Sequence, residues 1–235
     1  MSDWWSYRPS DFLMFSPRIY WRLFESLNAI WWPLQAMLVA AALAWLALTW
    51  RSTKAPSVQS ASAAAAVLGV CWLMTAWVFL LERFAPINAP ASGYALAFAL
   101  QGLGLLALAA AGQRAALLQR SPGGRPLIAL ALGLWALLGH PLLALASGRP
   151  LAQAELFGLA PDPTVIATLA FLLLVQPATG ARRLWRLLWW VPVAWCLVSA
   201  ATLATMGAVL QAGVLLGALA VALAARWRAG SRRER

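Results

Sequence analysis

Residues Pro9–Pro33 read PSDFLMFSPRIYWRLFESLNAIWWP, the only long segment of the chain that is both aromatic and charged. Ser16 and Pro17 predict a helix start, because serine caps free amides and proline suits the first helical position. At about 100° per residue, apolar side chains gather on one face of this helix and charged ones on the opposite face. The apolar face comprises Ile19, Tyr20, Leu23, Phe24 and Leu27. This pattern predicts an amphipathic helix that lies on a membrane surface.

Two roles are open for this surface helix. Aromatic residues flank it, and their rings favour the headgroup level of a bilayer, which suits an anchor. These residues are Trp4, Trp5, Tyr7, Trp31 and Trp32. The alternative is a lid over a polar site in the bundle that follows.

The composition is that of an integral membrane protein. The chain has 235 residues, of which 63% are hydrophobic and only 11% charged, whereas soluble domains are about a quarter charged. The acidic, aromatic start lacks the pattern of a signal peptide, so we expect none. Cys71 and Cys196 lie within apolar stretches, which predicts no disulfide. The net charge of +11 is best explained by orientation and anionic lipid, and no nucleic-acid partner is expected.

Apolar segments of about 20 residues, the length of a membrane span, follow the surface helix. Seven are predicted: Ile30–Trp50, Ala61–Leu81, Ser92–Ala111, Pro126–Ala146, Pro163–Ala178, Leu187–Thr205 and Met206–Ala225. The predicted fold is therefore an all-α integral membrane protein. Its parts are an interfacial segment at 1–29, a seven-helix transmembrane bundle at 30–225 and a basic cytoplasmic tail at 226–235.

The fifth span and the last two depart from the pattern of separate apolar runs of about 20 residues. The fifth has an uninterrupted apolar core only over Val165–Val175, and the last two require a tight turn near Thr205–Gly207. The rival count is six spans, with Leu187–Ala225 forming one long bent pair.

Charge orients the bundle. With seven spans, 13 of the 18 basic residues fall on one side of the membrane, and the basic side is cytoplasmic in most membrane proteins. We therefore expect the N-terminus outside and the C-terminus inside a membrane that the chain crosses several times. Six of the seven acidic residues fall on the outer side, and only Glu234 falls inside.

Two stretches carry a family resemblance. SDFLMFSPRIYWRLFESLN at residues 10–28 and QAELFGLAPDPTVIATLAFLLL at residues 153–174 resemble an uncharacterised family of bacterial multi-pass membrane proteins. It is a domain-of-unknown-function family, and some members carry an automatic permease label. The resemblance implies that the chain lies in a bacterial inner membrane. The resemblance spans the whole chain, but its motifs imply no chemistry, so it assigns no functional residue.

A polar site is predicted at the outer end of the bundle. His140, the only histidine, lies near the outer end of span four and precedes Pro141, which disturbs the helix. Glu82, Glu155 and Asp162 lie at the ends of neighbouring spans on the same side. We expect His140 and these three carboxylates to form an outer vestibule for a cation or polar solute. The alternatives are an interfacial packing role for His140, a helix cap at Asp162 and an ion pair between Glu82 and Arg83.

Other polar residues within the spans have a structural explanation. Gln101 and Gln211 are candidate intramembrane polar residues that we expect to bond between helices. Gly213 and Gly217 form a small-residue face of the kind that lets helices pack closely.

No enzymatic activity is predicted. The chain lacks a nucleophile motif, a phosphate loop and any metal-ligand spacing, so no catalytic residue, metal or cofactor is expected. The expected function is a transporter-like or permease-like bundle for a small polar solute. The alternative is a non-transporting accessory or scaffold subunit. Besides the lipid bilayer, the partner would be a second copy or another membrane protein.

Overall fold

The computed structural model describes residues 14–51, 57–114, 118–120, 125–177 and 179–230. Its helices are α1 (Pro17–Arg51), α2 (Val58–Met74), α3 (Ala91–Arg114), α4 (Arg125–Leu134), α5 (His140–Ala146), α6 (Pro161–Leu174), α7 (Arg182–Leu187), α8 (Trp190–Thr205) and α9 (Val209–Gly230). Two π-helical segments extend or join these helices: η3 (Thr75–Phe84) continues α2, and η4 (Trp135–Gly139) joins α4 to α5. The short elements are the 3₁₀ turns η5 (Leu151–Gln153) and η6 (Thr179–Ala181) and the strands β1 (Leu118–Arg120) and β2 (Val175–Pro177).

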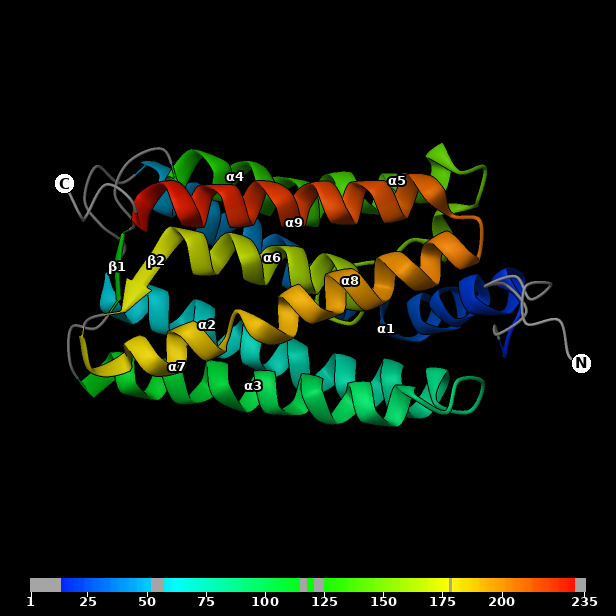
Figure 1. Cartoon of the computed structure of the whole chain (residues 1–235), viewed down its shortest axis with the longest axis horizontal. Coiled ribbons are helices and arrows are strands. Elements are labelled where there is room, and N and C mark those ends of the chain that lie inside the picture. Colours follow the sequence, from blue (N-terminus) through cyan, green and yellow to red (C-terminus); the bar gives the residue numbers. More distant parts are fainter. Residues whose placement is uncertain (1–13, 52–56, 115–117, 121–124, 178, 231–235) are drawn as a thin grey trace, which may run out of the picture.

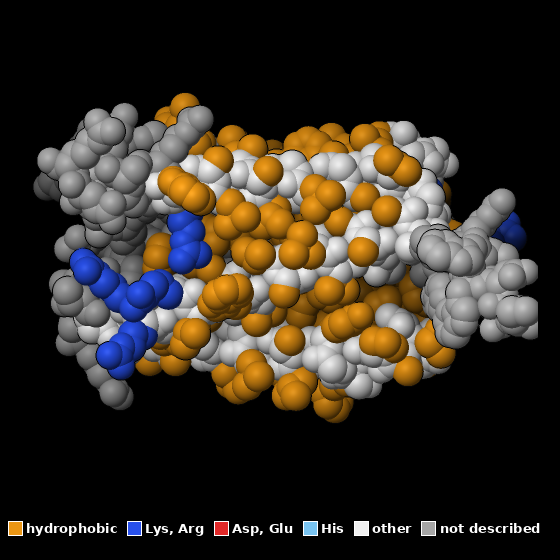
Figure 2. Space-filling model, in the orientation of Figure 1, with side chains coloured by type: hydrophobic (Ala, Val, Ile, Leu, Met, Phe, Trp, Pro, Cys, Tyr) orange, Lys and Arg blue, Asp and Glu red, His pale blue; other side chains and the backbone are white. Residues whose placement is uncertain are grey.

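The helices form an elongated bundle and run along its long axis, with the two termini at opposite ends (Figure 1). Within the described residues, six helices are long and apolar enough to cross a membrane: Pro17–Arg51, Gln59–Phe84, Ala91–Ala111, Pro126–Ala146, Arg182–Thr205 and Val209–Trp227. Figure 2 shows hydrophobic side chains over the length of the bundle, and Lys and Arg gathered at the end where α7 lies. Six of the seven predicted spans therefore correspond to helices of spanning length.

The fifth predicted span is a shorter, enclosed helix. α6 has 14 residues, and every one except Ala167 is buried. It packs against α2, α4, α8 and α9 in the middle of the bundle (Figure 1). At its C-terminal end, β2 pairs antiparallel with β1, with Val175 opposite Arg120. An apolar sequence suits contact with protein as well as contact with lipid, so its composition alone did not reveal this enclosure.

The rival interpretation of Leu187–Ala225 as one long bent pair is wrong. α8 ends at Thr205 and α9 begins at Val209, so a tight turn separates them where the sequence predicted one. Gly207 adopts a φ of +77° in this turn, a conformation that glycine enters without the steric cost of a Cβ atom.

The predicted surface helix and the first span are one continuous helix, α1, within the described residues. Its aromatic face packs against protein, since Phe24 stacks on Phe79 with ring centroids 4.7 Å apart and Tyr20 meets Phe84 edge-on at 5.6 Å. Ile19 of the same predicted face is exposed. The aromatic side chains of η3 give this face a partner, so it covers the end of the bundle and is not free to face lipid.

Helices α2 and α3 approach each other closely at Gly69 and Gly102. A Cβ atom on Gly69 would lie 2.9 Å from the carbonyl oxygen of Gly102, and one on Gly102 would lie 2.8 Å from the carbonyl oxygen of Gly69. The sequence pointed instead to Gly213 and Gly217, but no atom lies within 4 Å of a Cβ built on either. Their predicted close packing is absent among the described residues.

Candidate functional site

The connection from α5 to α6, residues 147–160, folds back into the end of the bundle. It is exposed or half-buried as far as Gln153 and mostly buried from Ala154 onward. Helix α1 binds it, because the Asn28 side-chain amide donates to the carbonyl oxygens of Ala152 and Ala154 at 2.9 and 2.8 Å. Gln35 donates in turn to Asn28 Oδ1 at 3.0 Å. The two bonds from Asn28 satisfy backbone carbonyl groups, which lipid tails could not do because they contain no hydrogen-bond donors.

His140 is placed by an irregular turn of its helix. Its backbone N–H donates to the carbonyl oxygen of Trp135, five residues earlier, at the end of η4. Pro141 follows, and a proline ring clashes with the carbonyl of an ordinary α-helical turn and has no N–H to donate. The wider π turn relieves that clash, so the disturbance predicted around Pro141 is present. Such π turns are frequent at functional sites.

Three of the four predicted vestibule residues come together here. His140, Glu155 and Asp162 each offer one ligand atom, and these atoms all lie within 4.8 Å of one another. The three side chains are 3%, 3% and 2% exposed. No hydrogen bond or ion pair of the described residues joins them, and neither His140 Nδ1 nor Glu155 Oε1 has a hydrogen-bond partner there. We refer to these three residues as the buried triad.

Asp162 fixes the start of α6 to α8. Trp195 Nε1 donates to Asp162 Oδ1 at 2.7 Å, and the Ser199 hydroxyl lies 2.9 Å from both carboxylate oxygens. The N-cap of α6 is Ala160, without a side-chain capping bond. The predicted capping role of Asp162 is therefore wrong, because its carboxylate bonds a neighbouring helix.

The two carboxyl groups of the buried triad have no cationic side chain paired with them in the described structure. Burial and the Asp162 carboxylate raise the pKa of Glu155 well above its usual range, while Arg149 lowers it. The Arg149 guanidinium lies 3.5 Å from the centre of the Trp21 ring and donates to the carbonyl oxygen of Gln153 at 3.1 Å. It forms no ion pair within 4 Å of either triad carboxylate, among the ion pairs seen in the described part of the chain.

Glu82 does not belong to this site. Its side chain is 50% exposed and pairs with Arg83 at 3.4 Å, the ion pair that the sequence offered as an alternative. Its inclusion in the vestibule is corrected. Glu82 lies in η3, where π-helical turns hold more residues than α-helical ones and so change which face a side chain occupies.

Comparison with known proteins places the chain in a family. The model of the family of unknown function DUF6064 matches residues 17–232. The chain belongs to this family. No curated protein and no solved structure matches it. The DUF6064 match runs from α1 to α9 and includes all three residues of the buried triad, so the site lies within the family domain.

The two glutamines predicted to lie within the spans, Gln101 and Gln211, bond between helices of this DUF6064 chain. Gln101 on α3 donates to the carbonyl oxygen of Leu188 at 2.9 Å, and Gln211 on α9 donates to the Ser147 hydroxyl after α5. Both are buried. Their amides are used in packing the bundle, and neither lies in the buried triad.

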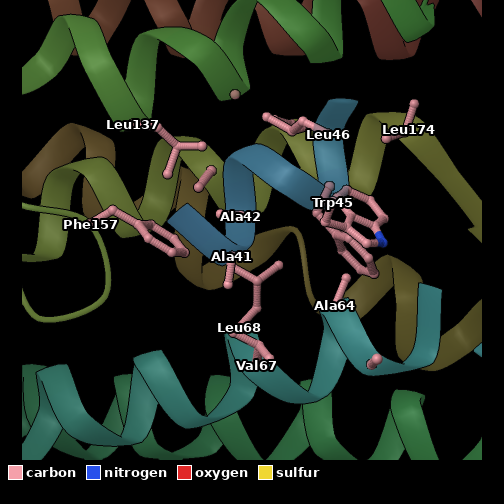
Figure 3. A pocket seen from close by; sticks show the side chains of 15 residues that line it. Ala41, Ala42, Trp45, Leu46, Ala64, Val67, Leu68, Leu137, Phe157 and Leu174 are labelled. Atoms are coloured by element: carbon pink, nitrogen blue, oxygen red, sulfur yellow. The ribbon is translucent and has the colours of Figure 1, made fainter. Parts of the chain in front are cut away.

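An apolar cavity of about 240 Å³ lies between α1, α2, η4 and α6 of the DUF6064 domain, lined by Trp45, Leu68, Leu137, Phe157 and Leu174 among others (Figure 3). The lining consists of alanine, leucine, valine, glycine and aromatic residues. Its one polar group, the Trp45 indole, already donates to the Ser60 carbonyl oxygen at 3.0 Å. This cavity therefore suits an apolar group, and the polar chemistry resides in the buried triad.

Several residues that build the site of this chain were not identifiable from the sequence. Trp195 and Ser199 hold Asp162 from 33 and 37 residues away, and Asn28 holds the connection from more than 120 residues away. No local spacing reveals such partners. Arg149 follows Gly148, which has a φ of +70° in the turn after α5, and its contact with the Trp21 ring has no local sequence signal.

Proposed function

We propose that this DUF6064 protein is a transporter-like bundle of the bacterial inner membrane that moves a small polar solute of positive charge. The observation that carries the proposal is the buried triad. Ionisable groups inside a membrane bundle are costly and mark solute or ion pathways. The uncompensated carboxylates of Glu155 and Asp162 favour a cation over an anion.

The architecture around the buried triad supports the same proposal. Irregular backbone at membrane depth is tolerated where it is buried in protein, and transporters use broken helices of this kind to build their binding sites. Here the connection at 147–160 and the short helix α6 form such a break. Helix α1 covers it through Asn28 and through Trp21, whose ring lies against the Arg149 guanidinium, which corresponds to the lid interpretation of the N-terminal helix.

Reconstitution in liposomes tests this function. Concentration jumps of Na⁺, Mn²⁺, Zn²⁺ or choline should produce a transport current for at least one of these cations. Glu155→Gln and Asp162→Asn should lower that current at least tenfold, because each removes a carboxyl group that could bind the cation. Glu82→Gln, an exposed carboxylate at the same end, should leave it unchanged. Currents equal to those of protein-free liposomes for all four cations would refute transport.

A non-transporting accessory or scaffold subunit is the second candidate, and the packing of α1 favours it. Only 11% of the residues in the most apolar stretch of this helix are buried within the chain. Trp32, Met37 and Leu48 are exposed there. Such a face lies against lipid or against a second membrane protein. A stoichiometric partner in mild detergent, together with absent transport currents, would establish this role.

The proposed orientation, N-terminus outside and C-terminus inside, has its own test. In a variant with Cys71 and Cys196 changed to alanine, Ala89→Cys should react with an impermeant thiol reagent on whole cells. Gly180→Cys should react only after lysis. Both positions are exposed, and Gly180 has open space around an added Cβ. The reverse pattern would invert the orientation.

A further inference from the structure

We infer that the buried triad of His140, Glu155 and Asp162 is a binding site for one first-row divalent transition-metal ion, such as Zn²⁺ or Co²⁺. The inference rests on the proposed function in one respect: it names the class of cation at the same site. It departs from the sequence-based expectation of no metal, which followed from the absence of a ligand motif. Here the ligands come from three separate elements, α5, the connection and α6.

The arrangement of the ligand atoms carries the inference. One imidazole nitrogen and two carboxylate oxygens converge within 4.8 Å, yet no hydrogen bond joins them in the described structure. Two ligands of one zinc ion lie about 3.5 Å apart, since each bond is about 2.0–2.2 Å long. Side-chain rotations that bring the atoms about 1 Å closer would therefore complete the coordination.

Two buried atoms of the triad need a partner. His140 Nδ1 and Glu155 Oε1 are inaccessible and unbonded among the described residues, and buried polar atoms are nearly always satisfied. A bound cation would relieve the repulsion between Glu155 and Asp162. Asp162 already has the supporting shell typical of a metal ligand, because Trp195 and Ser199 orient its carboxylate.

The mixed donor set selects the class of ion. Imidazole nitrogen suits zinc, iron, cobalt and nickel, whereas calcium takes six to eight oxygen ligands and magnesium a near-octahedral oxygen shell. Three protein ligands leave at least one position for water or an exchanging ligand. Leu151 and Ala152, which precede Glu155 by a few residues in the same connection, are exposed.

Metal binding is measured on the full-length protein in detergent, purified with a tag that contains no histidine. After chelation and dialysis, the protein should bind one Zn²⁺ or one Co²⁺ per chain in calorimetry. Because His140 is the only histidine, histidine-selective ¹⁵N labelling reports one imidazole, and its signals should shift with Zn²⁺. Bound Co²⁺ should give visible d–d absorption of a low-coordinate site.

Variants locate the ion. Glu155→Gln and His140→Gln should each weaken Zn²⁺ binding at least tenfold, while Glu82→Gln and Cys196→Ser should bind as the parent does. Unchanged binding by the Cys196→Ser variant would exclude coordination by the buried Cys196 thiol. Each variant is first checked for an unchanged elution profile, so that misfolding is not counted as lost binding. Undetectable Zn²⁺ and Co²⁺ binding by the parent, or unchanged binding in both triad variants, overturns the inference.

The experiments on metal binding and on transport can each give a negative result independently of the other. Cation currents in liposomes with no metal binding in detergent would leave the proposed transport intact and remove the metal site. One tightly bound Zn²⁺ per chain without any current would keep the metal site and remove transport.

Discussion

Gly102→Leu should prevent the bundle from folding, because α2 leaves no space for a side chain at this position. The Cβ alone would lie 2.8 Å from the backbone carbonyl oxygen of Gly69 and 2.9 Å from Leu73 Cγ. Overpacking a tight contact costs about 1–3 kcal/mol and sometimes more, and here the nearest atom belongs to a backbone that cannot rotate away. We expect a loss of at least about 3 kcal/mol, seen as aggregated protein in size-exclusion chromatography.

A matched control comes from α9. Gly217→Leu places the same side chain in open space and replaces a poor helix former by a good one, so its thermal unfolding midpoint should equal or exceed that of the parent. Trimming Leu73→Ala in the Gly102→Leu background should not restore folding, since the carbonyl of Gly69 remains. Recovery by that trimming would show that side-chain crowding, and not the backbone contact, limits this interface.

Asp162→Ala should lower the stability of the protein by about 2–4 kcal/mol, because two buried donors lose their acceptor. Trp195 Nε1 and the Ser199 hydroxyl both bond Asp162, and each buried group left without a partner costs about 1–3 kcal/mol. Relief of the repulsion with Glu155 offsets part of this loss. The measurement is thermal unfolding in detergent with a chelator present, so that bound metal does not contribute.

Glu155→Gln provides the contrast under the same conditions. Glu155 Oε1 has no hydrogen-bond partner in the described structure, so the substitution removes a buried acid whose charged form is disfavoured by burial and breaks no bond to that atom. Its unfolding midpoint should equal or exceed the parent value. A midpoint for Glu155→Gln as low as that of Asp162→Ala would mean that the two carboxylates have equivalent structural roles, contrary to the contacts described.

The helices of spanning length were predictable because a long apolar run with basic residues at its ends has few ways to avoid water other than to cross a membrane as a helix. Pro126–Ala146 was placed to the residue, and the turn near Gly207 followed from the need to separate two apolar runs. The enclosure of α6 was not predictable, since leucine and valine occur equally against lipid and against other helices. The same ambiguity led to the expectation that the aromatic face of α1 lies on a membrane surface.

The candidate site was predictable only in outline. Alternating spans placed His140, Glu155 and Asp162 at one end of the bundle, and the structure brings these three together. Glu82 is at that end too, but the π turns of η3 and its ion pair with Arg83 leave it outside. Helix direction decides which end a residue occupies, whereas rotation about the helix axis decides which face. An irregular turn that adds one residue to a helix changes the face on which later residues lie, but it does not change the end of the bundle at which they lie.

The position of His140 along its helix has an electrical consequence. Fourteen residues separate it from Pro126, where the span begins, which is about 21 Å at 1.5 Å per residue. In a hydrocarbon core of about 30 Å, the proposed orientation leaves roughly a third of the membrane thickness between His140 and the outer face. A divalent ion arriving from outside would cross about that fraction of the membrane voltage, which is worth about 1.5 kcal/mol at 100 mV. The affinity of the buried triad for this ion would then differ about tenfold between an energised and a de-energised membrane.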